Sequence, residues 1–313
     1  MAVLVLGATG FIGPAVVRAL DVLGVEVVAA SRRGEGQHGV AVDRRDTAQV
    51  RALVRDRGIH TVIDLLAYTE ADTLPLLAAL DGEVGRWVLA SSGDVYRNYE
   101  GLHKGAQPEP WLEALAETAP LRDGRYPYRT DPLRAAASPD AWMDAYDKIP
   151  LEAALRARPG LSGTILRLPM VFGPNDRQRR FRWIIAPMSA GKARITVDPA
   201  WAGWRTTYGY VDDVAHALAT AAFHAAAPGR TFNIGERDAP DHRTWIGRFA
   251  DTLGWRGETE SVPAPGGSPI AALDLRYPMA TDTNAFRDLC DWREPTPLAE
   301  ALARTAADEI ARG

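Results

Sequence analysis

The first residues of the chain combine a short apolar run with an amphipathic stretch. Residues 2–6 are continuously apolar and stop at Gly7, which is typical of a strand covered on both faces. From Phe11 to Leu23, apolar residues recur at helical spacing, and Pro14 is tolerated in a first helical turn. The pattern therefore predicts a strand, a glycine turn and a helix, in that order.

The alternation continues through the first half of the chain. A helix is predicted after Asp46, a capping residue, with Gly58 at its end. The other predicted elements are strands over 25–30, 61–66 and 87–90 and a helix over 74–80. Strands that each lead into a helix or loop favour a right-handed βαβ series. We therefore expect a doubly wound parallel sheet of the Rossmann type, with ligands beyond the carboxyl ends of the strands.

Residues 97–140 interrupt this rhythm with six prolines, five arginines and little apolar periodicity. A connection of this length is usually a functional lid or a mobile segment. We expect it to cover a site, and a plain surface loop is the alternative.

The second half of the chain is less regular, as expected of an interleaved, smaller C-terminal lobe that binds substrate. Residues 1–168 are predicted to form the sheet domain, with 203–234 returning to it, and 169–313 mainly the lobe. In the last helix, Thr296 is expected to be the N-cap and Pro297 the first helical residue. The other predicted elements are helices over 151–155, 211–223, 245–253 and 298–310 and strands over 164–168 and 231–234.

Composition narrows the classes of function. The 313 residues suffice for a large core, with 46% hydrophobic and 24% charged residues. The net charge of −4 leaves no global footprint for nucleic acid or an anionic membrane. A single cysteine, Cys290, excludes an intramolecular disulfide and multi-cysteine metal sites, and no histidine pair has metal-ligand spacing. Without a signal-peptide pattern or a long apolar run, we expect a cytoplasmic, soluble protein with no metal.

The glycine turn is the first functional signal. Gly7, Gly10 and Gly13 stand three residues apart between the predicted strand and helix. They allow a tight turn, close approach of the backbone to a diphosphate, and close packing of helix on strand. The helix start also offers free N–H groups. We therefore predict dinucleotide binding by the turn, which also contains Thr9, Phe11 and Ile12.

The end of the second strand bears on the choice of cofactor. An acidic residue there would accept the ribose hydroxyls of NAD, but the sequence has Ser31, Arg32 and Arg33. Arginine forks suit a 2′-phosphate, which favours NADP over NAD. The alternative is that both arginines are merely solvated.

Several further motifs occur in the order of one known family. They are Ser91-Ser92-Gly93-Asp94-Val95-Tyr96, Glu117-Thr118-Ala119-Pro120-Leu121, Arg167-Leu168-Pro169-Met170-Val171-Phe172-Gly173-Pro174 and Tyr210-Val211-Asp212-Asp213-Val214-Ala215. With the glycine turn, they make residues 3–235 resemble an extended short-chain dehydrogenase/reductase of the NAD-dependent epimerase/dehydratase family.

The resemblance implies further cofactor contacts and a type of substrate. Asp43 would contact the adenine, and Leu65, Leu66, Ala67 and Pro169 would line the cofactor groove. Extended members act on nucleotide sugars or similar polar molecules, often as homodimers.

The catalytic positions fit the family less well. By resemblance, Ser92 is the family serine and Lys148 the lysine that holds the nicotinamide ribose and lowers the pKa of a tyrosine. Asp144, four residues before Lys148, occupies the place of that tyrosine. Tyr146 is only two residues from Lys148, and such residues point to nearly opposite faces of a helix. Tyr146 can act as the acid/base only if the backbone departs from a helix, which Pro150 makes conceivable.

Asp94 offers another proton donor or acceptor. It stands two residues before Tyr96, where 4,6-dehydratases of the family carry an acidic acid/base residue. Burial would raise the pKa of its carboxyl group toward neutrality. We hypothesise that Asp94 shares proton transfer with Ser92, and a loop aspartate that accepts N–H groups is the alternative.

Two basic features could hold an anionic substrate. Arg177, Arg179, Arg180 and Arg182 follow Gly173-Pro174 with aromatic residues between them, and Arg205 follows Trp204. Guanidinium groups bind phosphates, so Arg177 and Arg205 are candidate substrate contacts, although a charge run is often just a solvated face. We do not expect nucleic-acid binding, since there is no broader basic stripe.

The favoured function is an NAD(P)-dependent epimerase, dehydratase or reductase that transfers hydride to or from a hydroxyl- or keto-bearing polar substrate. Two alternatives remain open. One is a redox-neutral isomerase or cyclase on the same fold, and the other is a non-catalytic NADP sensor or RNA-associated scaffold.

Overall fold

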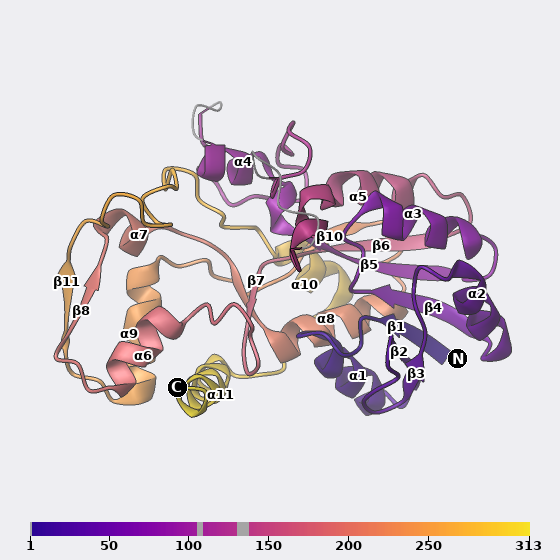
Figure 1. The fold of residues 1–313 in the computed structure, drawn as a ribbon, viewed down its shortest axis with the longest axis horizontal. Helices are drawn as coiled ribbons and strands as arrows, with labels where there is room; N and C mark the ends of the chain where they lie inside the picture. The colour runs from indigo at the N-terminus through magenta and orange to yellow at the C-terminus, as the bar shows by residue number, and fades with distance from the viewer. Residues whose placement is uncertain (1, 105–108, 130–137) are drawn as a thin grey trace.

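The computed structural model describes residues 2–104, 109–129 and 138–313, and a seven-stranded parallel sheet dominates one end of it (Figure 1). The strand order is β10-β6-β5-β4-β1-β2-β3. The strands are β1 (Ala2–Leu6), β2 (Glu26–Ser31), β3 (Gly39–Ala41), β4 (Ile59–Asp64), β5 (Arg86–Ser92), β6 (Ser162–Leu168) and β10 (Thr231–Asn233). The predicted doubly wound parallel sheet is confirmed.

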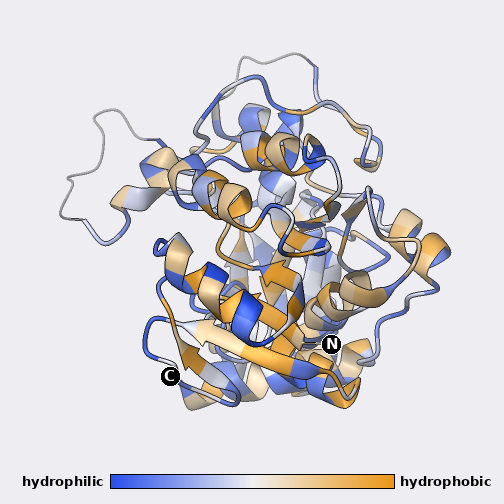
Figure 2. Cartoon of the chain, turned by 90° about the vertical axis from the view of Figure 1, so that its right-hand side faces the viewer, coloured by the Kyte–Doolittle hydropathy of each residue, from blue (hydrophilic) through white to orange (hydrophobic). Residues whose placement is uncertain are grey.

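Helices cover both faces of this sheet. On one face lie α1 (Gly13–Val22) and α8 (Val211–Phe223), and on the other lie α2 (Thr47–Asp56), α3 (Glu70–Ala79) and α5 (Lys148–Arg156). Alternate residues of β1 enter the two cores: Val3 and Val5 pack with α1 and α8, and Leu4 and Leu6 with the opposite helices. Because both faces are buried, the strands read as continuous apolar runs. Figure 2 shows the apolar strands enclosed between helices of mixed character.

A second part of the chain lies beside the sheet and extends away from it (Figure 1). Its outer end contains α6 (Arg182–Ser189), α7 (Pro199–Gly203), α9 (His242–Leu253) and a two-stranded sheet of β8 (Arg194–Val197) and β11 (Glu258–Ser261). Nearer the main sheet, β7 (Met170–Phe172) pairs with β9 (Tyr208–Tyr210). The remaining helices are α4 (Arg97–Lys104), α10 (Asn284–Cys290) and α11 (Leu298–Ala311), and short 3₁₀ turns are η1 (Gly93–Val95) and η2 (Ala141–Ala145).

Several elements differ from the sequence-based expectation. The second strand is followed by the three-residue strand β3 before any helix, and residues 97–104 form a helix. The N-cap of α11 is Pro297, so the expected cap at Thr296 is wrong. The Thr296 N–H instead donates to Asp213 Oδ1 at 3.0 Å, which ties the approach to α11 onto α8. Such short or tertiary-stabilised elements carry little periodic signal.

In the part of the chain that the structure describes, no helix combines the length and apolar character needed to cross a membrane. The strand β10 and helix α8 belong to the main sheet layer although they follow β7 in the chain. The division into residues 1–168 and 169–313, with 203–234 returning, stays a prediction.

Candidate active site

The turn after β1 places main-chain amides at the start of α1. Gly7 has a φ of +90°, and a Cβ on it would lie 2.8 Å from Leu66 Cγ. A Cβ on Gly13 would lie 2.3 Å from the Gly7 carbonyl oxygen, so glycine is needed for this close approach. The side chain of the N-cap, Ile12, makes no capping hydrogen bond to the first turn of the helix. A glycine turn that leads into a helix start fits the diphosphate of a dinucleotide.

A cleft of about 560 Å³ opens beside the turn. It is lined by residues of the turn, of α1, of the loop after β7 and of the start of α8, together with one arginine of α11: Thr9, Gly10, Phe11, Pro14, Ala15, Arg18, Pro174, Asn175, Arg177, Tyr210, Val211, Asp212 and Arg304. Backbone amides and guanidinium groups thus share one concave surface, a combination that suits a phosphate-bearing ligand.

The carboxyl end of β2 carries no acidic side chain. Ser31 Oγ accepts the Gly34 N–H at 3.0 Å, and Arg32 and Arg33 are exposed beside it. Arg33 pairs with Glu35 at 3.2 Å. Asp43, expected at the adenine, is exposed and follows β3.

The segment after β4 connects the glycine turn with the centre of the sheet edge. Leu66 lies against Gly7, and the Ala67 carbonyl oxygen accepts a hydrogen bond from Lys148 Nζ at 2.6 Å. Beneath this edge, Arg44 and Asp64 form a buried bidentate ion pair at 2.8 and 2.9 Å. The expected groove residues Leu65, Leu66 and Ala67 therefore lie between the turn and Lys148.

Lys148 is buried and bonded to two main-chain oxygens, one after β4 and one within β5. Besides Ala67, its Nζ donates to the Ala90 carbonyl oxygen at 2.7 Å. It lies 4.8 Å from the ring centroid of Tyr68 and 5.5 Å from that of Tyr146. Burial lowers the pKa of Lys148 to about 8, against the opposing charge of Asp94. The ammonium is thus a cation poised to titrate, directly beside two phenol rings.

The backbone before Lys148 is extended, which brings Tyr146 to the same side. Tyr146 has φ −66° and ψ 128°, and Asp147 has φ −163° and ψ 116°. The helix α5 begins only at Lys148, with Pro150 in its first turn, where proline is tolerated. Residues two apart in an extended chain point to one side. The helical reasoning that separated Tyr146 from Lys148 therefore does not apply here.

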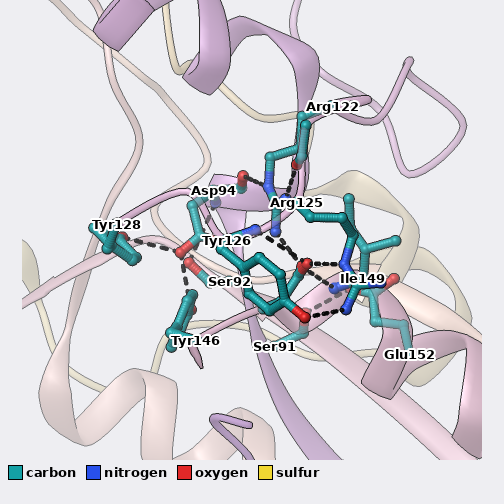
Figure 3. A network of polar contacts seen from close by, with 12 residues as sticks. Ser91, Ser92, Asp94, Arg122, Arg125, Tyr126, Tyr128, Tyr146, Ile149 and Glu152 are labelled. Carbon is teal, nitrogen blue, oxygen red and sulfur yellow. Dashed lines mark hydrogen bonds and ion pairs between the residues drawn. The ribbon is translucent and has the colours of Figure 1, made fainter. Parts of the chain in front are cut away.

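The Asp94 carboxylate accepts hydrogen bonds from two phenol hydroxyl groups (Figure 3). The Tyr146 and Tyr128 hydroxyl groups both donate to its Oδ2, at 2.8 and 3.0 Å. Its Oδ1 is buried and accepts no hydrogen bond from the described residues. Ser92 Oγ accepts the Asp94 N–H at 3.2 Å, so Ser92 lies at the same centre. A buried carboxyl oxygen without such a partner can accept a hydrogen bond from a ligand hydroxyl group.

Burial sets the protonation of this centre. It raises the pKa of Asp94, while the hydrogen bond from Tyr146 acts in the opposite direction. Burial and the Asp94 charge raise the pKa of Tyr146 well above the ordinary value. The phenol therefore keeps its proton unless a neighbouring group accepts it and a cation stabilises the phenolate. Asp94 and Lys148 are placed to do these two things.

Comparisons with known proteins agree with this geometry. A sequence model of the NAD dependent epimerase/dehydratase family matches residues 3–235. The chain belongs to this family. No curated protein sequence matches the chain.

Solved structures of similar fold cover the whole chain. A UDP-glucose 4-epimerase from Thermus thermophilus, in complex with NAD, is 24% identical, with TM-score 0.67 and 100% of both chains covered. The Thermotoga maritima UDP-glucose 4-epimerase with UDP-glucose is 20% identical, with TM-score 0.68 and 100% of this chain and 99% of that chain covered. The dTDP-glucose 4,6-dehydratase of Bacillus anthracis with NAD is 15% identical, with TM-score 0.68 and 99% and 97% covered.

This epimerase/dehydratase family protein is therefore an enzyme of the short-chain dehydrogenase/reductase type that uses a pyridine nucleotide. The predicted family and the predicted class of enzyme are both confirmed. The glycine turn, the segment after β4 and Lys148 all lie along the carboxyl edge of the sheet, where ligands of such folds bind. Pro169 follows β6 at the same sheet edge.

In this family protein, part of the segment predicted to cover a site lies on the Asp94 centre. Arg122 Nε donates to the Asp94 carbonyl oxygen at 3.1 Å, and Tyr128 to its carboxylate. Arg125 Nε donates to Asp147 Oδ2 at 2.6 Å. Residues 105–108 and 130–137 of the predicted covering segment, Arg134 among them, lie outside the described residues.

The arginines expected at the substrate are distributed differently. Arg177 lines the cleft at the glycine turn, whereas Arg205 is exposed elsewhere and donates to the Ala239 carbonyl oxygen at 3.0 Å. Arg179 pairs with Glu309 and so attaches the loop after β7 to α11. Arg180 pairs with Asp176 within the same loop. Within residues 2–104, 109–129 and 138–313, no cluster of three metal-ligating side chains occurs.

Sequence reasoning missed the roles of Asp147, Arg122 and Tyr68 in this family protein. Asp147 is flanked by Tyr146 and Lys148, and an aspartate beside a proposed helix start is a capping signal that could have indicated the break. Arg122 stood in an aperiodic stretch, where sequence alone assigns no partner. Tyr68 follows the groove residues, and its ring lies 6.1 Å from the ring of Tyr146.

Proposed function

We propose that this protein oxidises a hydroxyl-bearing carbon of a nucleotide sugar or sugar-like intermediate, transiently or as a net reaction, by hydride transfer to a bound pyridine nucleotide. One observation carries the proposal: the buried Tyr146 hydroxyl donates to Asp94 at 2.8 Å beside the Lys148 ammonium. This group lies at the carboxyl end of β5, with only β4 between it and the strand that leads into the glycine turn. The names of the similar structures, epimerases and a dehydratase of nucleotide sugars, support the substrate class.

The side chains have complementary roles in this proposal. Tyr146 takes the proton of the substrate hydroxyl and passes its own proton to Asp94 Oδ2. The Lys148 ammonium stabilises the phenolate, and Ser92 donates to the same substrate oxygen. A pyridine nucleotide held at the glycine turn and Lys148 would supply the hydride acceptor for the carbon that bears this oxygen. In a redox-neutral epimerisation, Tyr146 and Asp94 would return the proton to the same oxygen.

Cofactor contacts and substrate contacts belong to different arginines in the proposal. Arg177 shares the cleft with the glycine turn, so we assign it to the cofactor diphosphate and not to the substrate. Arg205 keeps its assignment to an anionic group of the substrate. Ser31, Arg32 and Arg33 replace the acidic residue that would favour NAD, which supports NADP as the preferred cofactor.

Calorimetric titration of the purified protein with NADP and with NAD tests this preference directly, and tighter binding of NAD would contradict it.

A cytoplasmic homodimer, which composition and the family resemblance imply, belongs to the same proposal. Sedimentation equilibrium tests the dimer, and a monomer at all concentrations would refute it.

The function itself is tested by cofactor absorbance during incubation with UDP-glucose, UDP-galactose and dTDP-glucose. Net or transient formation of reduced cofactor, lost in Tyr146→Phe and strongly reduced in Asp94→Asn, is the expected result. Arg194→Ala, an exposed position in β8, is the matched control. Conversion of a sugar with no reduced cofactor at any time would favour a redox-neutral isomerase or cyclase instead.

A further inference from the structure

We propose that Asp147 and Arg122 form a buried clamp that positions Tyr146 against Asp94 and Lys148, in place of the helical spacing of the family motif. The proposal rests on the proposed function for its catalytic meaning. The clamp itself is defined by contacts that are independent of any ligand.

Asp147, which separates Tyr146 from Lys148 in sequence, is fully buried. Its own N–H donates to the Tyr68 carbonyl oxygen at 3.1 Å, which holds the extended segment against the chain after β4. Its Oδ1 accepts the Ile149 N–H at 3.3 Å and thereby caps α5, the helix that Lys148 begins. One side chain therefore stabilises both the extended backbone of Tyr146 and the helical backbone of Lys148.

Arg122 connects this segment to the loop that carries Asp94. The guanidinium is buried and pairs with Asp147 Oδ1 through Nη2. Its Nε donates to the Asp94 carbonyl oxygen at 3.1 Å, and its main-chain N–H donates to the Val95 carbonyl oxygen at 2.8 Å. The loop after β5 and the segment before α5, which are far apart in the chain, are joined through one side chain (Figure 3).

The second carboxylate oxygen of Asp147 anchors the covering segment. Arg125 Nε donates to Asp147 Oδ2 at 2.6 Å, and the Tyr126 N–H donates to the same atom at 3.3 Å. Two residues further on, Tyr128 reaches Asp94. Both phenols on Asp94 are therefore placed through Asp147: Tyr146 by its neighbour in sequence and Tyr128 by the anchored segment.

A clamp is needed because the spacing of Tyr146 and Lys148 lacks the support of a helix. In a continuous helix, main-chain hydrogen bonds fix side chains four residues apart on one face. Here an extended residue must be held between them, and extended backbone has no such internal bonds. Buried, charge-assisted hydrogen bonds supply the missing constraint.

The experiment uses the full chain in three variants. Asp147→Asn keeps an N-cap acceptor and the side-chain size but loses the charge of the clamp. Arg122→Gln removes the other partner. Glu309→Gln is the matched control, because it also removes a buried carboxylate. Glu309 lies on α11 and pairs with Arg179.

The first readout is the NMR signal of tyrosine labelled with ¹³C at Cζ, with the Tyr146 signal assigned from Tyr146→Phe. We expect Asp147→Asn and Arg122→Gln to shift the Tyr146 signal, and Glu309→Gln to leave it in place. An unmoved signal in both clamp variants would overturn the proposal. This measurement needs no substrate, so it stands even if the proposed function fails.

The second readout is turnover of whichever nucleotide sugar proves active. We expect kcat of Asp147→Asn to fall at least tenfold with KM and cofactor affinity within about threefold, and its pH profile to shift. Equal kcat and pH profile in Asp147→Asn and Glu309→Gln would overturn the positioning role, whereas full activity of Tyr146→Phe would overturn the proposed function alone. If Asp147→Asn does not fold, Arg122→Lys, which keeps the charge but cannot reach both partners, decides by the same readouts.

Discussion

Lys148 is a charged side chain whose partners are main-chain oxygens. Its Nζ bonds to the carbonyl oxygens of Ala67 and Ala90, and the ring of Tyr146 lies beside it. Burial is the main cause of its low pKa, about 8. The group therefore loses its charge within a pH range in which ordinary lysines stay protonated.

This titration predicts the alkaline limit of activity. The ammonium is present below pH 8 and is lost as the pH rises through about 8, so stabilisation of the Tyr146 phenolate is lost in that direction. We expect kcat/KM, which reports groups of the free enzyme, to fall with a midpoint near 8. Lys148→Met should lose turnover at every pH while remaining folded. A midpoint near 10.5, the ordinary lysine value, would contradict the expectation.

At the scale of elements, the start of α5 decides which tyrosine can act. The chain runs from the 3₁₀ turn η2 through two extended residues into the helix, so the register of the helix does not extend back to Asp144. The Asp144 carbonyl oxygen accepts from Arg129 Nε at 3.0 Å, which ties position 144 to the covering segment.

Restoring the family spacing in sequence should therefore not restore function. The double variant Asp144→Tyr/Tyr146→Phe places a tyrosine four residues before Lys148, but on η2 and not on α5. We expect its turnover to be reduced 10²-fold or more, like that of Tyr146→Phe, in line with the usual loss of a general acid–base group. Turnover near that of the original chain would show that α5 extends one turn further when cofactor is bound.

The loop between β7 and α6 is the second element with a direct consequence. It carries Arg177 into the cleft at the glycine turn, while the neighbouring Arg180 is held by Asp176 at 2.8 Å. Arg177→Ala should weaken cofactor binding about 10- to 100-fold, the effect of losing a charge-assisted hydrogen bond of roughly 1.5–3 kcal/mol. Calorimetry measures it, with Arg205→Ala as the control. An unchanged dissociation constant in Arg177→Ala would remove Arg177 from the cofactor site.

Strong local patterns made most of the sheet and the cofactor turn predictable. The apolar run of residues 2–6 and the glycine spacing at 7–13 are local signals, and the structure places both as expected. The partners of Asp94 were not predictable, because Tyr128 and Arg122 reach it from a segment without periodicity. The geometry of Tyr146 depends on the extended backbone of Tyr146 and Asp147, whereas sequence spacing alone implies a helix there.

At the scale of the whole molecule, buried titratable groups link stability to pH. His242 is fully buried in the second part of the chain, where Tyr208 Oη lies 3.0 Å from its Nε2 and the Trp201 carbonyl oxygen lies 3.0 Å from its Nδ1. Burial lowers its pKa to about 4. The pKa values of Glu236 and Asp213 are changed in the other direction, because burial raises them to about 7 and about 6.

The histidine makes folding sensitive to acid. Between its ordinary pKa of 6.5 and about 4, the unfolded chain binds a proton that the folded chain does not. Stability from this group is complete above 6.5 and falls by up to about 3 kcal/mol as the pH drops to 4. Glu236 and Asp213 contribute the opposite dependence of stability on pH. The quantity to compare is therefore the difference in the free energy of unfolding between the original chain and His242→Gln.

Urea unfolding at a series of pH values measures this difference. We expect the stability gap between the original chain and His242→Gln to shrink as the pH falls from 6.5 to 4. A gap that stays constant over this range would show that His242 binds its proton equally in both states.

The strand β10 has a consequence for how the protein is made. It completes the sheet next to β6, yet residues 169–230 lie between the two strands in the chain. Asn233 on this strand also bonds to Tyr96 and to the Leu115 carbonyl oxygen, far earlier in the sequence. During synthesis, the β6 edge thus stays unpaired until residue 233 has left the ribosome, and an unpaired edge is a template for aggregation. Over that interval the nascent chain therefore exposes an edge that chaperones can shield.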